Sequence, residues 1–296
     1  MATPYGVRTP RNESMEILWE LFRIGKNQTI GNIYYVHGFN GNNTNDGLSP
    51  SSPLLTIVAA LAKCVDDRDD YIIVMDCWQQ DTFPINVNKS RVHILGAGHW
   101  GGMYPRMTPT GDTAIFTIST KGYIEIAYFS LGAGATHASI EFISASSEGR
   151  CWIHDVWLGH SETGQDGIKS TTGESPEHLI ENCVFGKLLT RDGIRLEAVS
   201  TRTIIRNNLF RRVPGVGINV VAINTDLGAI LDNKFSIAAA AAAGAAITIA
   251  AGAVGCMVNG NVAMEVGGLT TNNPYVDNGA CDWGVNWRGN VVTFPV

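Results

Sequence analysis

The second half of the chain repeats a short pattern in which a bulky apolar residue follows a polar turn. These residues recur at intervals of 25 to 29 positions and are Phe129, Trp157, Phe185, Phe210, Phe235, Val262 and Val291. A second apolar series, five positions earlier, comprises Ile124, Trp152, Ile180, Ile205, Ile230 and Met257. Small or turn-forming residues, such as Asn208 and Asn233, stand two positions before the bulky residue. This self-similarity predicts a repeat architecture.

A β-solenoid fits the repeat better than a leucine-rich horseshoe, because the Leu-rich consensus is missing and the apolar segments are short and β-branched. A second set of segments runs in step with the first and comprises Gly167–Lys169, Gly193–Leu196, Gly217–Val220 and Ala246–Ile249. We therefore expect at least two strands in each coil, with aliphatic ladders inside and Asn ladders in the turns. Each coil buries its apolar face only against its neighbours, so one cooperative body is expected.

The composition agrees with a buried, turn-rich β protein, since the chain has 33 glycines in 296 residues, with 45% hydrophobic and 16% charged residues. A solenoid grows in one dimension, so this length is compatible with one main body. A net charge of −6 leaves no basic footprint for nucleic acid. The six cysteines form no CxxC pair, and no histidine spacing suits zinc, so we expect no metal and no cofactor.

One uncharged stretch, Ser236–Val258, has the length of a membrane helix but consists mostly of Ala and Gly. These residues contribute little to insertion, and the stretch ends by returning to the repeat, so we expect no contact with a membrane. Its Ala-rich part, 238–246, predicts a turn or a seam at a subunit interface, with a short helix as the alternative. The N-terminus shows no signal-peptide pattern, which favours folding in a reducing cytoplasm.

Residues 1–30 differ from the repeat and predict a separate N-terminal arm. Ser14 can cap a short helix that ends at Gly25. Apolar side chains recur in it at helical spacing, and those expected to act as an anchor are Ile17, Trp19, Leu21 and Phe22. A helix this short is marginal alone. We therefore expect it to dock on the open end of its own solenoid or on a partner.

A turn-rich loop, Gly41–Pro53, leads into an apolar stretch that predicts a helix over about 53–65. Ser52 suits the N-cap and Pro53 suits the first turn. Three short apolar segments follow at 71–75, 83–87 and 92–98, and they predict strands.

This part of the chain resembles a known family. The loop reads NDGLSP at 45–50, the helix begins P-x-x-T-I at 53–57, and the third strand ends I-x-G-x-G at 94–98. Residues 31–296 therefore resemble the right-handed parallel β-helix proteins of the pectin-lyase-like superfamily. The resemblance implies an all-β solenoid whose N-terminal end is capped by the helix at 53–65. It also implies a superfamily that includes polysaccharide lyases, hydrolases, phage tailspikes and other virion proteins.

A hydrolase on this scaffold needs two or three carboxylates on one face. The nearest candidates are Asp166 and Asp192, which are 26 residues apart and in phase, with Asp226 in an Asn-Thr-Asp triplet and Arg195 as a basic partner. The triplet is similar to one motif of the polygalacturonases, but the Gly-His-Gly and Arg-Ile-Lys partners of that family are absent from the sequence. Asp-Gly dipeptides also mark ordinary turns before a strand. We therefore expect turns here rather than catalytic residues.

The sequence favours a non-enzymatic structural protein of a bacteriophage virion, in particular a trimeric capsid decoration or cement protein. The expected partners are the major capsid protein or other virion proteins and two further copies of this chain. The arm would dock through Trp19 and Phe22, and the protein would assemble in the host cytoplasm and reside in the virion. This expectation rests on the resemblance and on the lack of a catalytic set in the sequence.

Two alternatives stay open. A tailspike-type polysaccharide lyase or hydrolase would place Asp166, Asp192 and Arg195 together in one groove. A non-catalytic module that binds a host glycan would instead align exposed aromatic rings along one face. The tryptophans available for such a row, Trp100, Trp157 and Trp283, are widely spaced in the sequence.

Overall fold

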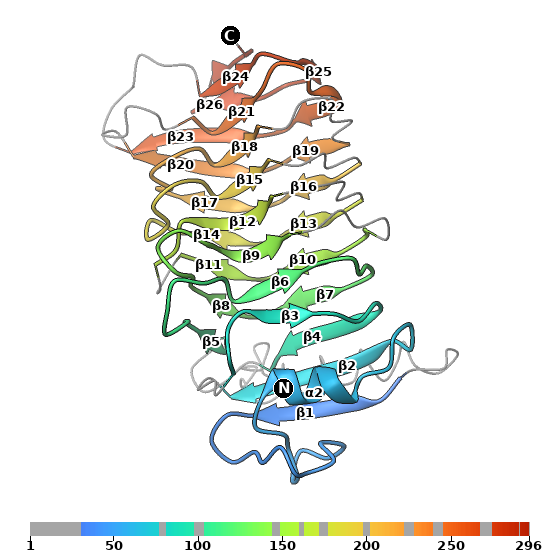
Figure 1. Cartoon of the computed structure of the whole chain (residues 1–296). Coiled ribbons are helices and arrows are strands. Elements are labelled where there is room, and N and C mark those ends of the chain that lie inside the picture. The colour runs from blue at the N-terminus through green and yellow to red at the C-terminus, as the bar shows by residue number, and fades with distance from the viewer. Residues whose placement is uncertain are drawn as a thin grey trace, which may run out of the picture.

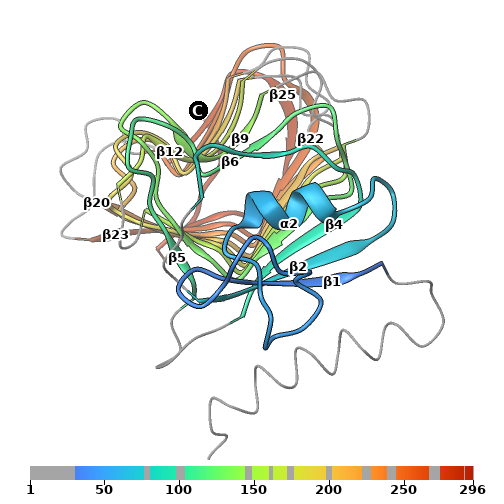
Figure 2. The ribbon, with the colours of Figure 1, turned by 60° about the horizontal axis from the view of Figure 1, so that its bottom comes forward.

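The computed structural model describes residues 31–76, 81–97, 104–143, 149–159, 163–171, 177–197, 202–221, 228–238, 245–266, 274–289 and 291–295. Within these ranges the chain winds into a stack of coils walled by parallel sheets on three sides (Figures 1 and 2). Each coil passes along the front of the stack, returns along the back and rises toward the C-terminus, so the winding is right-handed. The predicted fold class, an all-β right-handed parallel β-helix, is confirmed.

Three sheets form the walls in the described part of the chain. Sheet A has ten strands: β1 (Ile33–His37), β2 (Asp70–Asp76), β4 (Val92–Gly96), β7 (Glu125–Ala127), β10 (Trp152–His154), β13 (Leu179–Glu181), β16 (Ile204–Arg206), β19 (Ala229–Leu231), β22 (Val254–Asn259) and β25 (Ala280–Trp283). Sheet B has eight: β3 (Ile85–Val87), β6 (Phe116–Ile118), β9 (Ala138–Phe142), β12 (Asp166–Ser170), β15 (Ile194–Leu196), β18 (Ile218–Val220), β21 (Ile247–Ile249) and β24 (Tyr275–Asp277). Sheet C has nine: β5 (Arg106–Met107), β8 (Ser130–Leu131), β11 (Trp157–Leu158), β14 (Val184–Phe185), β17 (Leu209–Arg211), β20 (Lys234–Ala238), β23 (Val262–Val266), β26 (Trp287–Arg288) and β27 (Val291–Val292).

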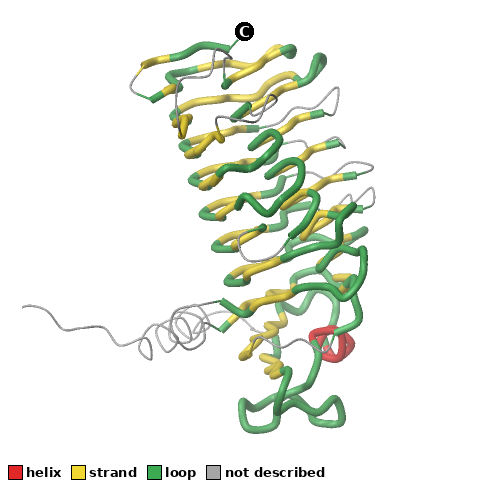
Figure 3. Tube along the Cα trace, turned by 90° about the vertical axis from the view of Figure 1, so that its left-hand side faces the viewer, coloured by secondary structure: helices red, strands yellow, loops and turns green. Residues whose placement is uncertain are grey.

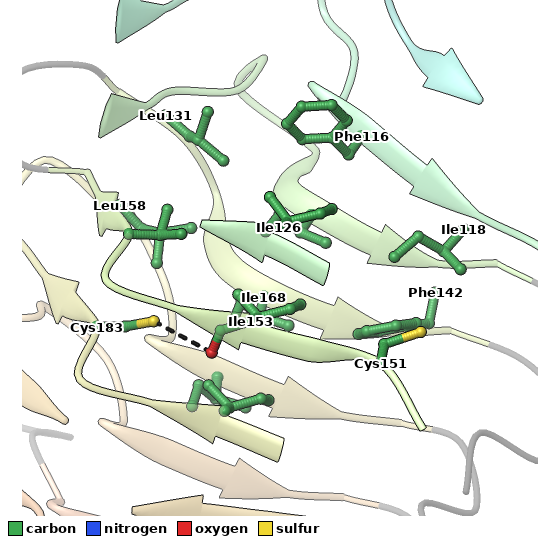
Figure 4. Packing of buried hydrophobic residues seen from close by; sticks show 14 of the residues in the cluster. Phe116, Ile118, Ile126, Leu131, Phe142, Cys151, Ile153, Leu158, Ile168 and Cys183 are labelled. Atoms are coloured by element: carbon green, nitrogen blue, oxygen red, sulfur yellow. Dashed lines mark hydrogen bonds between the residues drawn. The ribbon is translucent and has the colours of Figure 1, made fainter. Parts of the chain in front are cut away.

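The interior is filled by ladders of equivalent apolar residues from successive coils. In sheet A the inward series runs Ile94, Ile126, Ile153, Ile180, Ile205, Ile230 and Val258, all fully buried. In sheet C, Phe210 stacks between Phe185 and Phe235 with ring centroids 4.6 and 4.7 Å apart. Figure 4 shows Ile126 and Ile153 in adjacent coils pointing into this core. Stacking equivalent residues at the strand spacing makes the core continuous along the axis.

The register corrects part of the repeat inferred from sequence. In sheet C, Leu158 pairs with Phe185 and Ala263 pairs with Phe235, so Trp157 and Val262 lie one position out of phase. In sheet A the same slip applies to two members of the second series. Their neighbours Ile153 and Val258 occupy the interior instead, and both Trp152 and Met257 are exposed. Because side chains alternate between the faces of a strand, a slip of one residue moves a side chain from the core to the surface.

An asparagine ladder holds the turn between sheets A and C. Asn208, Asn233, Asn261 and Asn286 are fully buried. The Asn233 carboxamide oxygen accepts hydrogen bonds from the backbone N–H and the side-chain amide of Asn208, both at 3.0 Å. Asn233 repeats both bonds to Asn261, also at 3.0 Å. The predicted ladder is confirmed, although its third member is Asn261 rather than the neighbouring Gly260.

Three of the four ladder residues follow a residue with a left-handed backbone. Asn207, Asp232 and Gly260 have φ values of 55°, 55° and 72°. Gly, Asn and Asp tolerate this region better than other residues, and here it turns the chain sharply from sheet A into sheet C. The polar residues in the repeat are therefore required by the backbone of the turn.

The predicted helix is present but shorter. Helix α2 covers Ile57–Lys63, and its N-cap is Thr56, whose hydroxyl accepts a hydrogen bond from the Ala59 N–H at 3.1 Å. The Asp81 carboxylate adds to the cap by accepting from the N–H groups of residues 57 and 58 at 3.0 and 2.9 Å. Ser52 and Pro53 lie in the loop before the helix. The Pro53 carbonyl accepts a hydrogen bond from the Asn42 N–H at 3.0 Å, whereas a carbonyl in the first helical turn accepts from the N–H four residues later.

Helix α2 packs against β1, β2 and β3 at the N-terminal end of the stack (Figures 2 and 3). It buries Ile57, Ala60 and Leu61 there. Its protective role as a cap remains a prediction, as does the separate character of residues 1–30, which lie outside the described ranges. Within those ranges no helix is long and apolar enough to cross a membrane.

The C-terminal end finishes differently from the coils below it. Strand β26 pairs in parallel with β23, and β27 then pairs with β26 in antiparallel fashion, with Trp287 opposite Val292. Val291 therefore belongs to a terminal hairpin and not to a parallel coil, which corrects the last member of the first sequence series.

We expect Asn233→Ala to destabilise the solenoid strongly. The change removes the carboxamide oxygen that accepts from two buried donors of Asn208, and the amide that donates to the Ile205 carbonyl and to Asn261 Oδ1. Unsatisfied buried groups cost about 1 to 3 kcal/mol each, so we expect a loss on the order of 2 to 4 kcal/mol in urea unfolding. Asn86→Ala, at an exposed position on β3, is the matched control and should change the unfolding free energy by less than about 0.5 kcal/mol. Equal effects of the two substitutions would contradict the ladder's role.

Candidate functional site

The two sequence candidates Asp166 and Asp192 lie at equivalent positions in adjacent coils, where the chain enters sheet B. Both side chains are buried. Asp166 accepts hydrogen bonds from the Arg191 guanidinium, with Nε at 2.9 Å, and from the backbone N–H of Asp192 at 3.0 Å. Asp192 in turn accepts from the backbone N–H of Val216 in the next coil at 2.8 Å. The carboxylates therefore link successive coils.

A charged cluster surrounds Asp192 on the outer face of sheet B. Arg195 donates to Asp192 at 2.8 Å and to Glu197 at 2.6 Å. Lys169, which pairs with Arg195 in register, lies 3.2 Å from Glu197, and the Asn219 amide donates to Asp192 at 2.8 Å. Two basic and two acidic groups thus lie together on neighbouring strands.

The electrostatics of this cluster favour its charged forms. Burial disfavours the charge on Arg195, but hydrogen bonds to Glu197 and Asp192 outweigh burial and raise its pKa. Burial likewise opposes ionisation of Glu197, and the hydrogen bonds from Arg195 and Lys169 lower its pKa. Both side chains are therefore held as a persistent ion pair near neutral pH.

The arrangement meets only part of the geometry set out for an enzyme. Asp192 and Arg195 are in contact, whereas Asp166 is bound to Arg191 instead. Asp226 lies outside the described residues. Arg195 also differs from the solvated arginine expected on an outer face, because its side chain is enclosed by Asp192 and Glu197.

A second polar network lies on the outer face of sheet A and was not found from the sequence. Glu125 bridges two histidines, with His93 Nδ1 at 2.6 Å from one oxygen and His154 Nε2 at 2.8 Å from the other. His154 Nδ1 lies 2.8 Å from the Asp155 carboxylate. The residues come from β4, β7, β10 and the turn after β10. Separations of about 30 residues conceal this network in the sequence, and only the register brings it together.

The network shifts the pKa values of its members in opposite directions. Burial disfavours the imidazolium of His154, but hydrogen bonds to Asp155 and Glu125 outweigh it and raise the pKa of His154 to about 9. Burial also opposes the charge on Glu125, yet the hydrogen bonds from His154 and His93 lower its pKa to about 2. A charged His–Glu pair is therefore maintained over a broad pH range.

Aromatic rings pack around this network. Tyr71 stacks on His93 with centroids 4.2 Å apart, and Trp152 stacks on His154 at 3.9 Å. The Trp152 indole N–H donates to Glu181 at 2.9 Å. The next carboxylate in register after His154 is thus tied to the same aromatic group, and the network continues along the face.

Other candidates for chemistry are structural. His178 is buried, stacks on Phe142 at 4.2 Å, and its Nδ1 accepts the Cys151 N–H at 3.2 Å. Burial lowers the pKa of His178 to about 3, so the ring is neutral at neutral pH. Cys183 is buried at a ladder position, and burial raises the pKa of its thiol to about 12. Among the described residues, no group of three or more His, Cys, Asp or Glu side chains is arranged to hold a metal ion.

The two described tryptophans that were available for a glycan-stacking row lie on different sheets. Trp157 is on β11 of sheet C, whereas Trp283 ends β25 of sheet A and donates to Asp277 at 2.7 Å. Trp100 lies outside the described residues. The two described rings therefore do not form a row along one face.

Comparison with known proteins gives likeness in fold only. No family model and no curated protein matches the chain. Among solved structures, the pectate lyase Pel9A matches with a TM-score of 0.49 and 13% identity over 89% of this chain and 78% of that one. A rhamnogalacturonan lyase matches with a TM-score of 0.45 and 12% identity over 79% of this chain and 74% of that one. ORF18 of Geobacillus virus E2 matches with a TM-score of 0.47 and 12% identity over 97% of this chain and 66% of that one.

The His154–Glu125 pair predicts a specific dependence of stability on pH. His154 has a folded-state pKa of about 9 against an ordinary 6.5, so its contribution is complete below about pH 6.5 and is lost as pH rises through 9. Glu125 has a folded-state pKa of about 2 against 4.5, so its contribution is complete above about pH 4.5 and is lost as pH falls through 2. Thermal melting should show that His154→Gln removes about 1 to 3 kcal/mol of stability at pH 6 and much less at pH 10.

His137→Gln serves as the control for this measurement, because His137 is more exposed than His154 and lies just before β9 of sheet B, outside the Glu125 network. It should leave the difference between pH 6 and pH 10 as it is in the unsubstituted protein. A His154→Gln variant that loses the same amount at both pH values would show that the pair does not carry the pH dependence.

Proposed function

We propose that this protein is a non-enzymatic structural component of a bacteriophage virion, namely a homotrimeric capsid decoration or cement protein. The observation that best supports a structural role is that several titratable groups on the described parts of sheets A and B bond to residues of neighbouring coils. Both oxygens of Asp166 and of Asp192 accept hydrogen bonds within the chain. A catalytic carboxylate instead needs an oxygen that can meet substrate or water.

Ion pairs reinforce the solenoid along its length. Glu177 is held between Arg150 and Arg202 from the coils on either side, with Arg202 at 2.7 Å. Near the N-terminal end, Asp69 and Arg91 make a similar link between coils. Exposed pairs contribute little individually, but a ladder of them acts with the Asn and Phe stacks to resist bending. A stiff body is suited to bridging neighbouring units of a shell.

Placement in a virion rests on the resemblance stated for residues 31–296 and on the predicted arm. In this proposal the arm binds the major capsid protein or another virion protein through Ile17, Trp19, Leu21 and Phe22, while the solenoids stand side by side. The protein folds in the host cytoplasm before it joins the particle.

Deletion of residues 2–30 tests the anchor. The truncated protein should keep the circular dichroism spectrum and melting behaviour of a β-helix, because the core begins at β1 and α2. It should fail to join particles when added to shells that lack the protein, measured by co-sedimentation. Double substitution of Trp19 and Phe22 by Ser in the full chain should reproduce the loss. Unchanged incorporation of both variants would contradict the anchoring role.

A second candidate function is supported by the charged cluster on sheet B. Lys169, Arg195, Asp192 and Glu197 place acids and bases on one face, and such groups recognise acidic or hydroxyl-rich sugars. In this reading the protein is a tailspike-type protein that binds or cleaves a host polysaccharide, and Arg195 binds and orients the sugar. The closed ion pairs favour binding over cleavage.

Incubation with host surface polysaccharide distinguishes the two functions. The structural proposal predicts no release of oligosaccharides and no unsaturated product absorbance. If the protein is a depolymerase, Arg195→Ala should reduce turnover by about 10² or more, whereas Arg211→Ala, at an exposed position on β17, should not. Oligosaccharide release that depends on Arg195 would therefore overturn the non-enzymatic assignment.

A further inference from the structure

One lane on the outer face of sheet A is apolar over five consecutive coils. Its members are paired in register and are Trp152, Leu179, Ile204, Ala229 and Met257. Trp152 is 40% exposed, Ile204 36% and Met257 53%, and the other two are half-buried. A continuous exposed row of this kind is unusual on a soluble surface and marks an interaction site more often than single exposed residues do.

The apolar lane lies between two polar lanes. On one side, Glu177 is joined to Arg150 and Arg202, and all three precede the strands of the same coils. On the other side, Glu181 accepts from Arg206 at 2.7 Å and from Trp152 at 2.9 Å. A dry centre with a polar rim is the usual anatomy of a protein–protein interface. The rim charges are already paired, so burying this face would leave few uncompensated ions.

We propose that this lane is the self-association surface of the protein, on which a second copy packs side by side with its solenoid axis parallel to the first. The proposal rests on the homo-oligomer in the proposed function and identifies its interface. We infer that the partner is a second copy of the chain from the axial spacing of the side chains in the lane. Side chains in the lane repeat at the strand separation of about 4.8 Å, and another copy presents the same repeat. Two such faces can interdigitate coil by coil over their whole length.

The size of the face is adequate for this role. Sheet A has ten strands in the described chain, so nine steps of about 4.8 Å give a height of about 43 Å. With a width of about 18 Å, the whole outer face of sheet A has an area on the order of 800 Å² per copy, which is the usual size for a stable interface. The apolar lane crosses five of these ten strands, from β10 to β22.

Parallel packing predicts which residues of neighbouring copies face each other. Around an axis parallel to the solenoids, each residue of the lane meets its own equivalent at the same height. Met257 would then face Met257, and Trp152 would face Trp152. An antiparallel dimer would instead bring Met257 to Trp152, because Ile204 lies at the centre of the lane.

The test is the solution mass of the full chain by light scattering, followed by substitution within the lane. The unsubstituted protein should be a trimer, and both Ile204→Glu and Met257→Glu should reduce the mass to that of a monomer, because each places like charges from all copies close together. The matched control is Val221→Glu, which is 37% exposed after β18 on sheet B and should remain a trimer. Circular dichroism of each variant establishes that the fold is retained.

Crosslinking provides a second measurement that does not depend on a destabilising charge. Met257→Cys should form a disulfide between copies when a mild oxidant such as diamide removes two electrons and the two thiol protons. Val221→Cys and the unsubstituted chain should not.

An unsubstituted protein that is a monomer would overturn the proposal. So would a trimer that survives both glutamate substitutions and does not crosslink through residue 257, although the oligomeric part of the proposed function would then stand. Loss of particle incorporation by a protein that stays trimeric would concern the arm and not this face.

Discussion

The structure depends on the alignment of equivalent residues in successive coils, at the spacing that parallel strands impose. Each position of a coil has a copy of itself about 4.8 Å above and below, so every side chain must be compatible with its own equivalents. The asparagine ladder meets this requirement, because each carboxamide donates to the next one and accepts from the one before it. Phe185, Phe210 and Phe235 meet it by stacking. A ladder of this kind also fixes the register, since a shift of one residue would break all its bonds together.

The same requirement governs the charged residues. A column of identical charges would repel itself, and two columns alternate signs between coils: Glu177 lies between Arg150 and Arg202, and Glu125 lies between His93 and His154. Such groups are useful for holding coils together only while they stay paired. This conflicts with the needs of catalysis, in which a carboxylate or base must exchange partners with substrate. In the described part of the chain, these ion pairs join neighbouring coils.

The sequence predicts the parts of the fold that repeat locally. The period, the β-strands, the Asn turns and the solenoid follow from short patterns, because the left-handed turn selects Asn, Asp or Gly and the interior selects Ile, Val or Phe. The sequence predicts less well which residues of each strand face the interior. Trp152 and Met257 are as bulky as core residues, and only pairing shows that Ile153 and Val258 occupy the interior instead. The His93–Glu125–His154 network depends on contacts between residues about 30 positions apart, and no local signal marks them.

The two residues that the sequence pattern wrongly places in the interior, Trp152 and Met257, lie on the same outer face of sheet A. A large apolar residue gains about 1.5 to 3 kcal/mol when it is buried, so a row of them left on the surface in successive coils is costly unless something covers it. In a globular domain the covering surface must be shaped residue by residue. In a solenoid the axial repeat is set by the backbone, so another copy of the chain already has the matching spacing, and each apolar residue added to a lane extends the contact by one coil. The constraint that builds the interior thus also determines what the exterior can bind.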